Sequence, residues 1–236
     1  MKLLAADKQA IGASSVYEHP YAPSREDEET VAFLLSLRGK GIRDKHILRA
    51  FETVPRKMFV ESRYHDLVRS NISLPIACGQ STLAPTTIAR IISLLDIKGE
   101  HTVLEIGTGS GYVTALLARL AKLVMSFERF HTLALGAAQR LPALGITNVE
   151  LYHADGFEAG YEIEAVDRIV MMGAVDDVPE NVLLSLKRGG KLVAVVSEND
   201  KTHLCVITRG ENDEYTLKKE ETMNLPPLIP GVAQAL

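Results

Sequence analysis

The sequence lacks most features that mark secreted, membrane or nucleic-acid-coating proteins. Its 236 residues include two cysteines, Cys78 and Cys205, which are too few for a disulfide framework and do not lie at metal-ligand spacing. No uncharged apolar stretch approaches the roughly 20 residues of a spanning helix. Lys and Arg number 26 against 30 Asp and Glu, whereas nucleic-acid-binding proteins usually have a basic excess. We therefore expect no metal, no nucleic-acid partner and no membrane partner.

We also expect no export signal at the N-terminus. Its apolar run meets Asp7 and Lys8 almost at once, so it is shorter than the h-region of about 7–15 residues in a signal peptide. Because a low cysteine content is typical of proteins in a reducing compartment, we expect a cytoplasmic protein.

The composition is that of an ordinary globular protein, with 46% hydrophobic and 24% charged residues. A chain of this length can bury a large core, so we expect one compact domain. Within it we distinguish a flexible arm at 1–24, a helical region with a long loop at 25–98, and a core at 99–236.

Helices are expected in the N-terminal region wherever apolar residues recur at helical spacing. They cover residues 26–38, 44–53 and 87–95, and Pro55 ends the second. The stretch 71–85 contains Pro75, Gly79 and Pro85, so it is interpreted as a loop.

After Gly99, short apolar runs alternate with helical segments. The runs are 102–106, 122–127, 149–153, 167–172, 191–196 and 204–208, and the helices are 112–120, 132–141 and 179–186. Strands separated by helices indicate βαβ units. The predicted fold class is therefore α/β, with a doubly wound, mostly parallel sheet and an antiparallel edge strand at 214–221.

The clearest motif runs from Val103 to Tyr112, where an apolar strand enters a turn containing Gly107, Gly109 and Gly111. A dinucleotide fingerprint would need its third glycine at position 112, and a phosphate-binding loop would need Lys with Ser or Thr after its last glycine. A sulfonium ligand with an amino-acid group fits better, since a helix N-terminus can hold its carboxylate. The alternative is a tight turn without a ligand.

Three acids end successive predicted strands. Glu105 precedes the glycines and can orient their loop, Glu128 can accept the hydroxyls of a ribose, and Asp155 can accept an adenine amino group. The carboxyl ends of strands are where open α/β sheets bind ligands. The alternatives are a solubilising acid at Glu128 and a turn-forming Asp-Gly pair at Asp155 and Gly156.

These motifs resemble those of class I S-adenosylmethionine-dependent methyltransferases, which have a Rossmann-like fold. Segments outside that core are similar to the protein-L-isoaspartate O-methyltransferase family: Val-Pro-Arg at 54–56, Leu-Pro-Ile at 74–76, and Gly79 with Gln80. The resemblance covers roughly residues 25–231. It implies S-adenosyl-L-methionine as cofactor and S-adenosyl-L-homocysteine as product. The implied cofactor-binding residues are Gln80, Glu105, Gly107, Thr108, Gly109, Ser110, Gly111, Glu128, Arg129, Asp155 and Gly156.

The resemblance also implies a protein-repair enzyme that methylates the α-carboxylate of L-isoaspartyl residues in damaged proteins or peptides. We expect it to act as a monomer or a small homo-oligomer. Its substrate-loop positions are Ser81, Thr82 and Leu83, which are the candidate catalytic residues.

Three departures from the family pattern leave the acceptor open. Leu83 stands where the family has Ser, the family's C-terminal Arg is missing at 224–228, and Asp176 and Asp177 follow the fourth strand. A family relative with another acceptor, or a cofactor-binding protein without catalysis, are the alternatives. A base-amine methyltransferase is disfavoured, because no Asp/Asn-Pro-Pro-Tyr/Phe motif ends the fourth strand.

Overall fold

The structure is a computed structural model that describes residues 24–161, 163–199 and 201–233. The expected arm at 1–24 lies outside these residues except for Ser24, which caps the first helix. Among the described residues, no helix has both the length and the apolar character needed to cross a membrane.

A seven-stranded sheet forms the centre of the molecule, in the order β5-β4-β3-β6-β7-β8-β9. Strands β3 to β7 pair in parallel, whereas β8 and β9 are antiparallel to their neighbours. The strands are β3 (Thr102–Ile106), β4 (Leu123–Glu128), β5 (Val149–His153), β6 (Val166–Val175), β7 (Leu186–Glu198), β8 (Lys201–Arg209) and β9 (Tyr215–Thr222). The doubly wound, mostly parallel sheet is confirmed.

One strand direction differs from the sequence prediction. The run at 204–208 was expected among the parallel strands, but β8 is antiparallel to β7, with Glu198 opposite Lys201. A connection this short can join only antiparallel strands, because a parallel pair needs a crossover of about a dozen residues. The sheet therefore has two antiparallel strands at this side rather than one.

Helices cover both faces of the sheet. The helices α3 (Pro85–Leu95), α4 (Tyr112–Ala118) and α5 (His131–Ala143) pack on the face that contains Val103 and Val170. The opposite face contains Leu104 and Ile169 and is covered by η3 (Ala159–Tyr161) and α6 (Glu180–Leu184). Successive strand residues point to opposite faces, so a continuous apolar run supplies both cores.

The N-terminal region packs beside this core. It comprises α1 (Arg25–Gly39), α2 (Lys45–Thr53), η1 (Arg56–Phe59), η2 (Ser62–Leu67), β1 (Leu74–Pro75) and β2 (Ser81–Thr82). Both helices have capping residues, Ser24 for α1 and Asp44 for α2, whose side chains accept backbone N–H bonds. The stretch 71–85, expected to be a loop, contains a short hairpin in which Leu74 pairs with Thr82.

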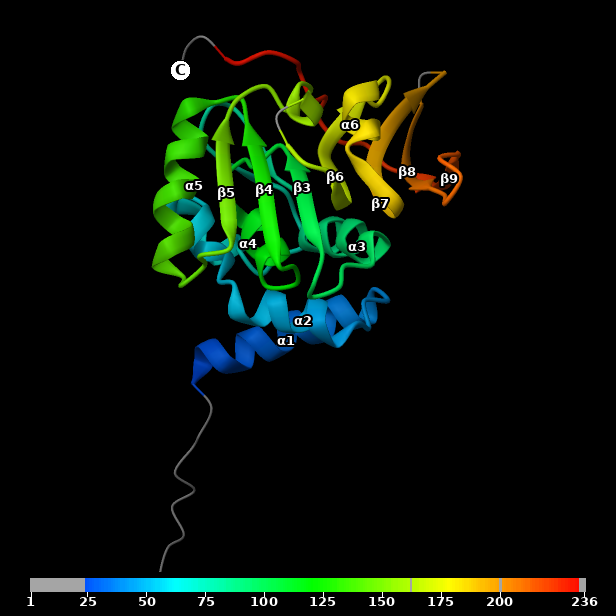
Figure 1. Cartoon of the computed structure of the whole chain (residues 1–236). Coiled ribbons are helices and arrows are strands. Elements are labelled where there is room, and N and C mark those ends of the chain that lie inside the picture. Colours follow the sequence, from blue (N-terminus) through cyan, green and yellow to red (C-terminus); the bar gives the residue numbers. More distant parts are fainter. Residues whose placement is uncertain (1–23, 162, 200, 234–236) are drawn as a thin grey trace, which may run out of the picture.

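The C-terminal segment crosses the carboxyl ends of the central strands (Figure 1). Pro227 bridges to Ala174 at the end of β6, and the Gly231 N–H donates to Asp155 Oδ2 at 2.6 Å. Arg129 Nε donates to the Gly231 carbonyl at 2.9 Å. Residues far apart in the chain therefore meet at the edge where the sequence predicts a ligand.

Candidate active site

A pocket lies at the carboxyl ends of β3, β4 and β6, where the strand order reverses beside β3. The space at this site is about 710 Å³ when its open mouth is included. It is called the main pocket below. Its lining comprises Ile76, Gln80, Ser81, Ile106, Gly107, Gly109, Phe127, Glu128, Arg129, Phe130, Leu133, Asp155, Gly156, Phe157, Met172, Pro227, Leu228 and Ile229.

The glycine loop between β3 and α4 forms one wall. Gly107, Gly109 and Gly111 all have positive φ, at 99°, 57° and 90°. A Cβ atom on Gly107 would lie 3.3 Å from Met172 Cβ and 3.4 Å from Leu228 Cδ2, both of which line the pocket. A side chain at position 107 would therefore narrow the pocket as well as strain the backbone.

Glu128 is held at the end of β4 and is only 5% exposed. Its two carboxylate oxygens accept one backbone N–H each, from Gly109 at 2.7 Å and from Phe130 at 2.9 Å. Burial raises the pKa of Glu128, and these N–H donors oppose the rise. A carboxylate has about four lone-pair sites, so each oxygen retains a site for a ligand hydroxyl.

Asp155 follows β5 and lines the main pocket together with Gly156 and Arg129. Its Oδ1 accepts from the Phe157 N–H at 2.9 Å, and its Oδ2 accepts from the Gly231 N–H. Asp155 thus joins the pocket to the C-terminal segment as well as offering acceptor sites to a ligand.

Glu105 lies beneath the glycine loop and does not line the main pocket. It also does not line the smaller pocket described in the next paragraph. Its Oε2 accepts hydrogen bonds from Thr114 Oγ1 and Ser126 Oγ, each at 2.6 Å, and its Oε1 is buried without a partner among the described residues. Burial raises the pKa of Glu105 to about 8, against the opposing effect of the two hydroxyls. The Glu105 carboxyl group therefore joins β3 to α4 and β4 through Thr114 and Ser126, and its predicted role in orienting the glycine loop stays a prediction.

A smaller hollow adjoins the main pocket and shares with it Ile76, Ser81, Gly107, Gly109 and Met172. It is called the side pocket below. Its remaining lining residues are Thr82, Leu83, Thr108, Ser110, Tyr112 and Val113. None of these described lining residues carries a formal charge, so an anion there would meet hydroxyl groups rather than a cation or a repelling carboxylate.

Two hydroxyl residues of the side pocket differ in their bonding. Thr108 Oγ1 lies 2.5 Å from Ser126 Oγ, so it belongs to the network around Glu105. Ser110 is 4% exposed, and its Oγ has no hydrogen-bond partner among the described residues. An unpaired buried hydroxyl is costly, so Ser110 favours a ligand that can accept its hydrogen bond.

The three substrate-loop candidates all line the side pocket, yet they are not equivalent. Ser81 is exposed, Thr82 is 7% exposed, and Leu83 is 7% exposed with its side chain in the main core cluster. The Leu83 side chain has no hydrogen-bonding atom and serves as an apolar wall. Gln80 lies in the hairpin turn, where its Nε2 donates to the Cys78 carbonyl at 3.2 Å.

The sequence-predicted residues thus lie around two adjoining pockets, except Glu105 and Gly111. Gly111 packs against α5, where a Cβ atom would lie 3.0 Å from Ala137 Cβ. Asp176 and Asp177 are exposed and line neither pocket. Sequence reasoning missed the apolar lining of the main pocket, above all Pro227–Ile229, which no local motif marks.

Comparisons with known proteins give a family match over most of the chain. The family model of protein-L-isoaspartate(D-aspartate) O-methyltransferase matches residues 28–232. A protein-L-isoaspartate O-methyltransferase of Rhodopseudomonas palustris (strain BisA53) is 39% identical over 217 residues, which cover 92% of this chain and 100% of the relative. One from Xanthobacter autotrophicus is 36% identical over 211 residues, covering 89% of this chain and 96% of the relative.

Solved structures show the same fold. A protein-L-isoaspartate O-methyltransferase superposes with a TM-score of 0.78 at 23% identity, covering 86% of this chain and 67% of the other. A Plasmodium falciparum protein described as a beta-aspartate methyltransferase, in complex with S-adenosyl-L-homocysteine, gives a TM-score of 0.73 at 21% identity, covering 84% and 97%.

Proposed function

The chain belongs to the protein-L-isoaspartate(D-aspartate) O-methyltransferase family of enzymes, and we propose that it methylates the free α-carboxylate of L-isoaspartyl residues in damaged proteins. The observation that supports a carboxylate as the methyl acceptor is the uncharged, hydroxyl-lined side pocket, which adjoins the main pocket. Such a pocket suits a carboxylate that must remain reactive.

S-adenosylmethionine is the family's cofactor, and when bound it supplies an electrophilic methyl group on a sulfonium. The main pocket fits this group, because Glu128 and Asp155 both retain acceptor sites and the glycine loop leaves room beside Met172. We assign the ribose hydroxyls to Glu128, the adenine amino group to Asp155, and the amino-acid part to the glycine loop.

The chain's own part in the reaction is to hold and desolvate the acceptor. A carboxylate is already ionised at pH 7, so no general base is required. Ser81, Thr82 and Ser110 would donate hydrogen bonds to one carboxylate oxygen and thereby direct the other toward the main pocket. Leu83 and Met172 provide apolar walls that exclude water.

We further propose that the enzyme works in the cytoplasm, as a monomer or small homo-oligomer, on peptide and protein substrates alone. The free cysteines Cys78 and Cys205 support a reducing compartment. The acidic balance of 30 to 26 supports an enzyme without a nucleic-acid partner.

The decisive experiment offers labelled S-adenosylmethionine and two peptides that differ only in an isoaspartyl or a normal aspartyl linkage. We expect base-labile methyl ester on the isoaspartyl peptide alone. Ser110→Ala should lower kcat/KM for that peptide by about ten- to hundredfold, since a hydrogen bond to a charged group is worth about 1.5–3 kcal/mol.

Ser93→Ala is the matched control, because Ser93 lies on α3 and lines neither pocket, and its activity should equal that of the unmodified chain. No label on either peptide, with S-adenosylhomocysteine still bound in calorimetry, would refute isoaspartate as the acceptor.

A further inference from the structure

Arg56 is a buried cation outside both pockets. It begins η1, is 5% exposed, and forms no ion pair within the described part of the chain. Its guanidinium instead donates to four backbone carbonyls: Val68 and Ser70 at 3.3 Å each, Ile72 at 2.8 Å and Leu83 at 3.0 Å. Burying an unpaired charge is costly, so an arrangement of this kind calls for a reason beyond packing.

Arg56 contacts two residues that line the side pocket, Leu83 and Tyr112. One carbonyl belongs to Leu83, directly after the hydroxyl residues of β2, and the others belong to the segment 68–72. The guanidinium carbon also lies 5.9 Å from the centre of the Tyr112 ring, within cation–π range. Tyr112 begins α4 directly after the glycine loop and lines the side pocket.

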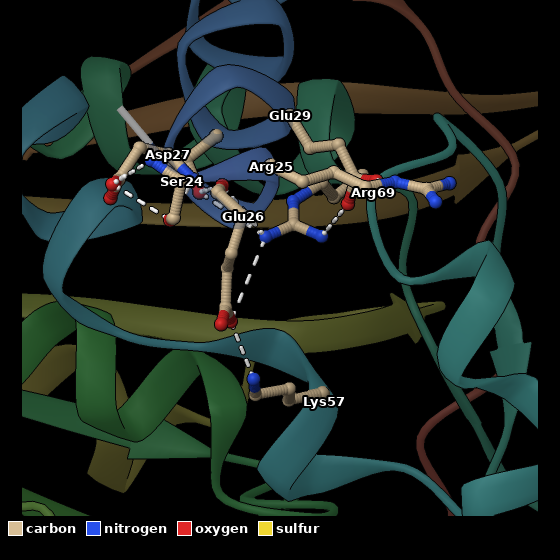
Figure 2. Close-up of polar contacts among 8 residues, drawn as sticks. Ser24, Arg25, Glu26, Asp27, Glu29, Lys57 and Arg69 are labelled. Atoms are coloured by element: carbon tan, nitrogen blue, oxygen red, sulfur yellow. Dashed lines mark hydrogen bonds and ion pairs between the residues drawn. The ribbon is translucent and has the colours of Figure 1, made fainter. Parts of the chain in front are cut away.

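The segment 68–72 is also held from its outer side by α1. Arg69, which lies between Val68 and Ser70, points outward and donates to Glu29 at 2.7 Å and to Thr30 Oγ1 at 3.2 Å. Lys57, next to Arg56, pairs with Glu26 (Figure 2). Segment 68–72 is therefore bound to Arg56 on its inner side and to α1 on its outer side.

Arg56 also borders a third hollow, away from the main pocket. This hollow is lined by the aromatic residues Phe33, Phe51 and Tyr112 as well as by Arg56, and it opens to the surface. It gives a small solute a route to the guanidinium position if the Arg56 side chain is removed.

We infer that Arg56 is a positioning residue for the acceptor: through the Leu83 carbonyl and the Tyr112 ring it sets the distance between the β2 hydroxyls and the glycine loop. The inference rests on the proposed function, because it takes the side pocket as the acceptor site. It assigns to a buried arginine, which touches neither ligand, control over the alignment of the methyl acceptor.

The test compares Arg56→Ala and Arg56→Lys with the unmodified chain and with Arg63→Ala, an exposed arginine of η2 that lines none of the three hollows. Acceptor kinetics, S-adenosylhomocysteine affinity and Tm are measured for each. We expect Arg56→Ala to lower kcat/KM for the isoaspartyl peptide about ten- to hundredfold, because misplacing a reacting group by about 1 Å can cost a hundredfold. The Kd for S-adenosylhomocysteine should change less than about twofold.

The kcat/KM of Arg56→Lys should lie between those of Arg56→Ala and the unmodified chain, because an ammonium has three donors and cannot reproduce the planar guanidinium. Adding methylguanidinium or ethylguanidinium to Arg56→Ala, below concentrations that change its Tm, should restore part of kcat/KM in a saturable manner. A merely structural role would lower Tm and the active fraction without changing the acceptor KM, and saturable rescue would be absent.

Amide hydrogen exchange separates this inference from the proposed function. Faster exchange of residues 68–83 in Arg56→Ala, with β3 and β4 unchanged, would support the positioning role even if the unmodified chain rejected the isoaspartyl peptide. Unchanged exchange at 68–83, or equal losses of acceptor and cofactor affinity, would overturn the inference.

Discussion

The carboxyl group of Glu105 is enclosed beneath the glycine loop, with one oxygen bonded twice and the other without a partner among the described residues. Burial raises its pKa from 4.5 to about 8. Between these two values the folded protein holds a proton that the unfolded chain has released. The free energy of unfolding therefore falls as pH rises through this window, by at most about 1.4 kcal/mol per pH unit.

Glu105→Gln should abolish this pH dependence, because the amide is neutral at every pH in the range. Relative to the unmodified chain, the variant should gain stability between about pH 5 and about pH 8, whatever its constant offset. Urea unfolding midpoints across the window measure the effect. Glu158→Gln, which changes an exposed acid, is the control and should follow the unmodified chain. Parallel curves for Glu105→Gln and the unmodified chain would contradict a raised pKa.

At the same scale, the sequence predicts residue types better than it predicts their contacts. Glu128 and Asp155 line the main pocket because Glu128 ends β4 and Asp155 follows β5, and the ends of strands can be predicted from apolar runs. The pairing of Asp155 with Gly231 could not be predicted, because 76 residues separate them and no periodicity marks the C-terminal segment. Likewise, burial of the Leu83 side chain depends on tertiary packing that spacing alone does not show.

Among the elements, the contact between α4 and α5 depends on a glycine. Gly111 has φ of 90°, and a Cβ atom there would lie 3.0 Å from Ala137 Cβ. Gly145, just after α5, also has positive φ, at 66°, but a Cβ atom there would meet nothing within 4 Å. A residue with a side chain would therefore be strained at both positions, but it would be crowded only at position 111.

Alanine at these two positions separates the two costs. Gly145→Ala should destabilise the fold by about 1–2 kcal/mol through its left-handed backbone alone. Gly111→Ala should lower the free energy of unfolding by about 1–3 kcal/mol more than Gly145→Ala, because the added methyl group overpacks the contact between α4 and α5. Urea unfolding measures both. Equal losses of stability in the two variants would mean that α5 moves to accommodate the methyl group without a free-energy penalty.

The elements themselves are largely readable from the sequence. The bounds of β3 and β5 match the predicted runs, because buried parallel strands are continuous apolar segments. The direction of β8 was missed, although the Asn-Asp pair at 199–200 of the sequence is typical of a tight turn. The hairpin of β1 and β2 was also missed, because strands of two residues are too short to show alternation.

At the scale of the whole molecule, Leu228 connects the C-terminal segment to the glycine loop that follows β3. Its side chain lies against Gly107 and Gly173 and lines the main pocket, and its N–H donates to the Ala174 carbonyl at 2.8 Å. The main pocket is thus bordered by a segment more than a hundred residues from the glycine loop, and we expect the affinity for the cofactor to depend on that contact.

Leu228→Ala should raise the Kd for S-adenosylhomocysteine about fivefold, the equivalent of about 1 kcal/mol from a partly buried apolar side chain. Val232→Ala is the matched control in the same segment, because Val232 is 43% exposed and lines neither pocket. Calorimetry with each variant measures the effect. An unchanged Kd for Leu228→Ala, or equal changes in both variants, would show that the segment does not contribute to cofactor binding.

Strand β9 lies at one end of the sheet order, and its sequence includes Lys218, Lys219, Glu220 and Glu221. Arg90 on α3 donates to Glu220 and Glu221 from the neighbouring layer. An outer strand offers unpaired backbone groups to another chain, and charged side chains along it oppose such pairing. An enzyme that acts on damaged, partly unfolded proteins meets many extended chains, and we expect this charged border to oppose their addition to the sheet.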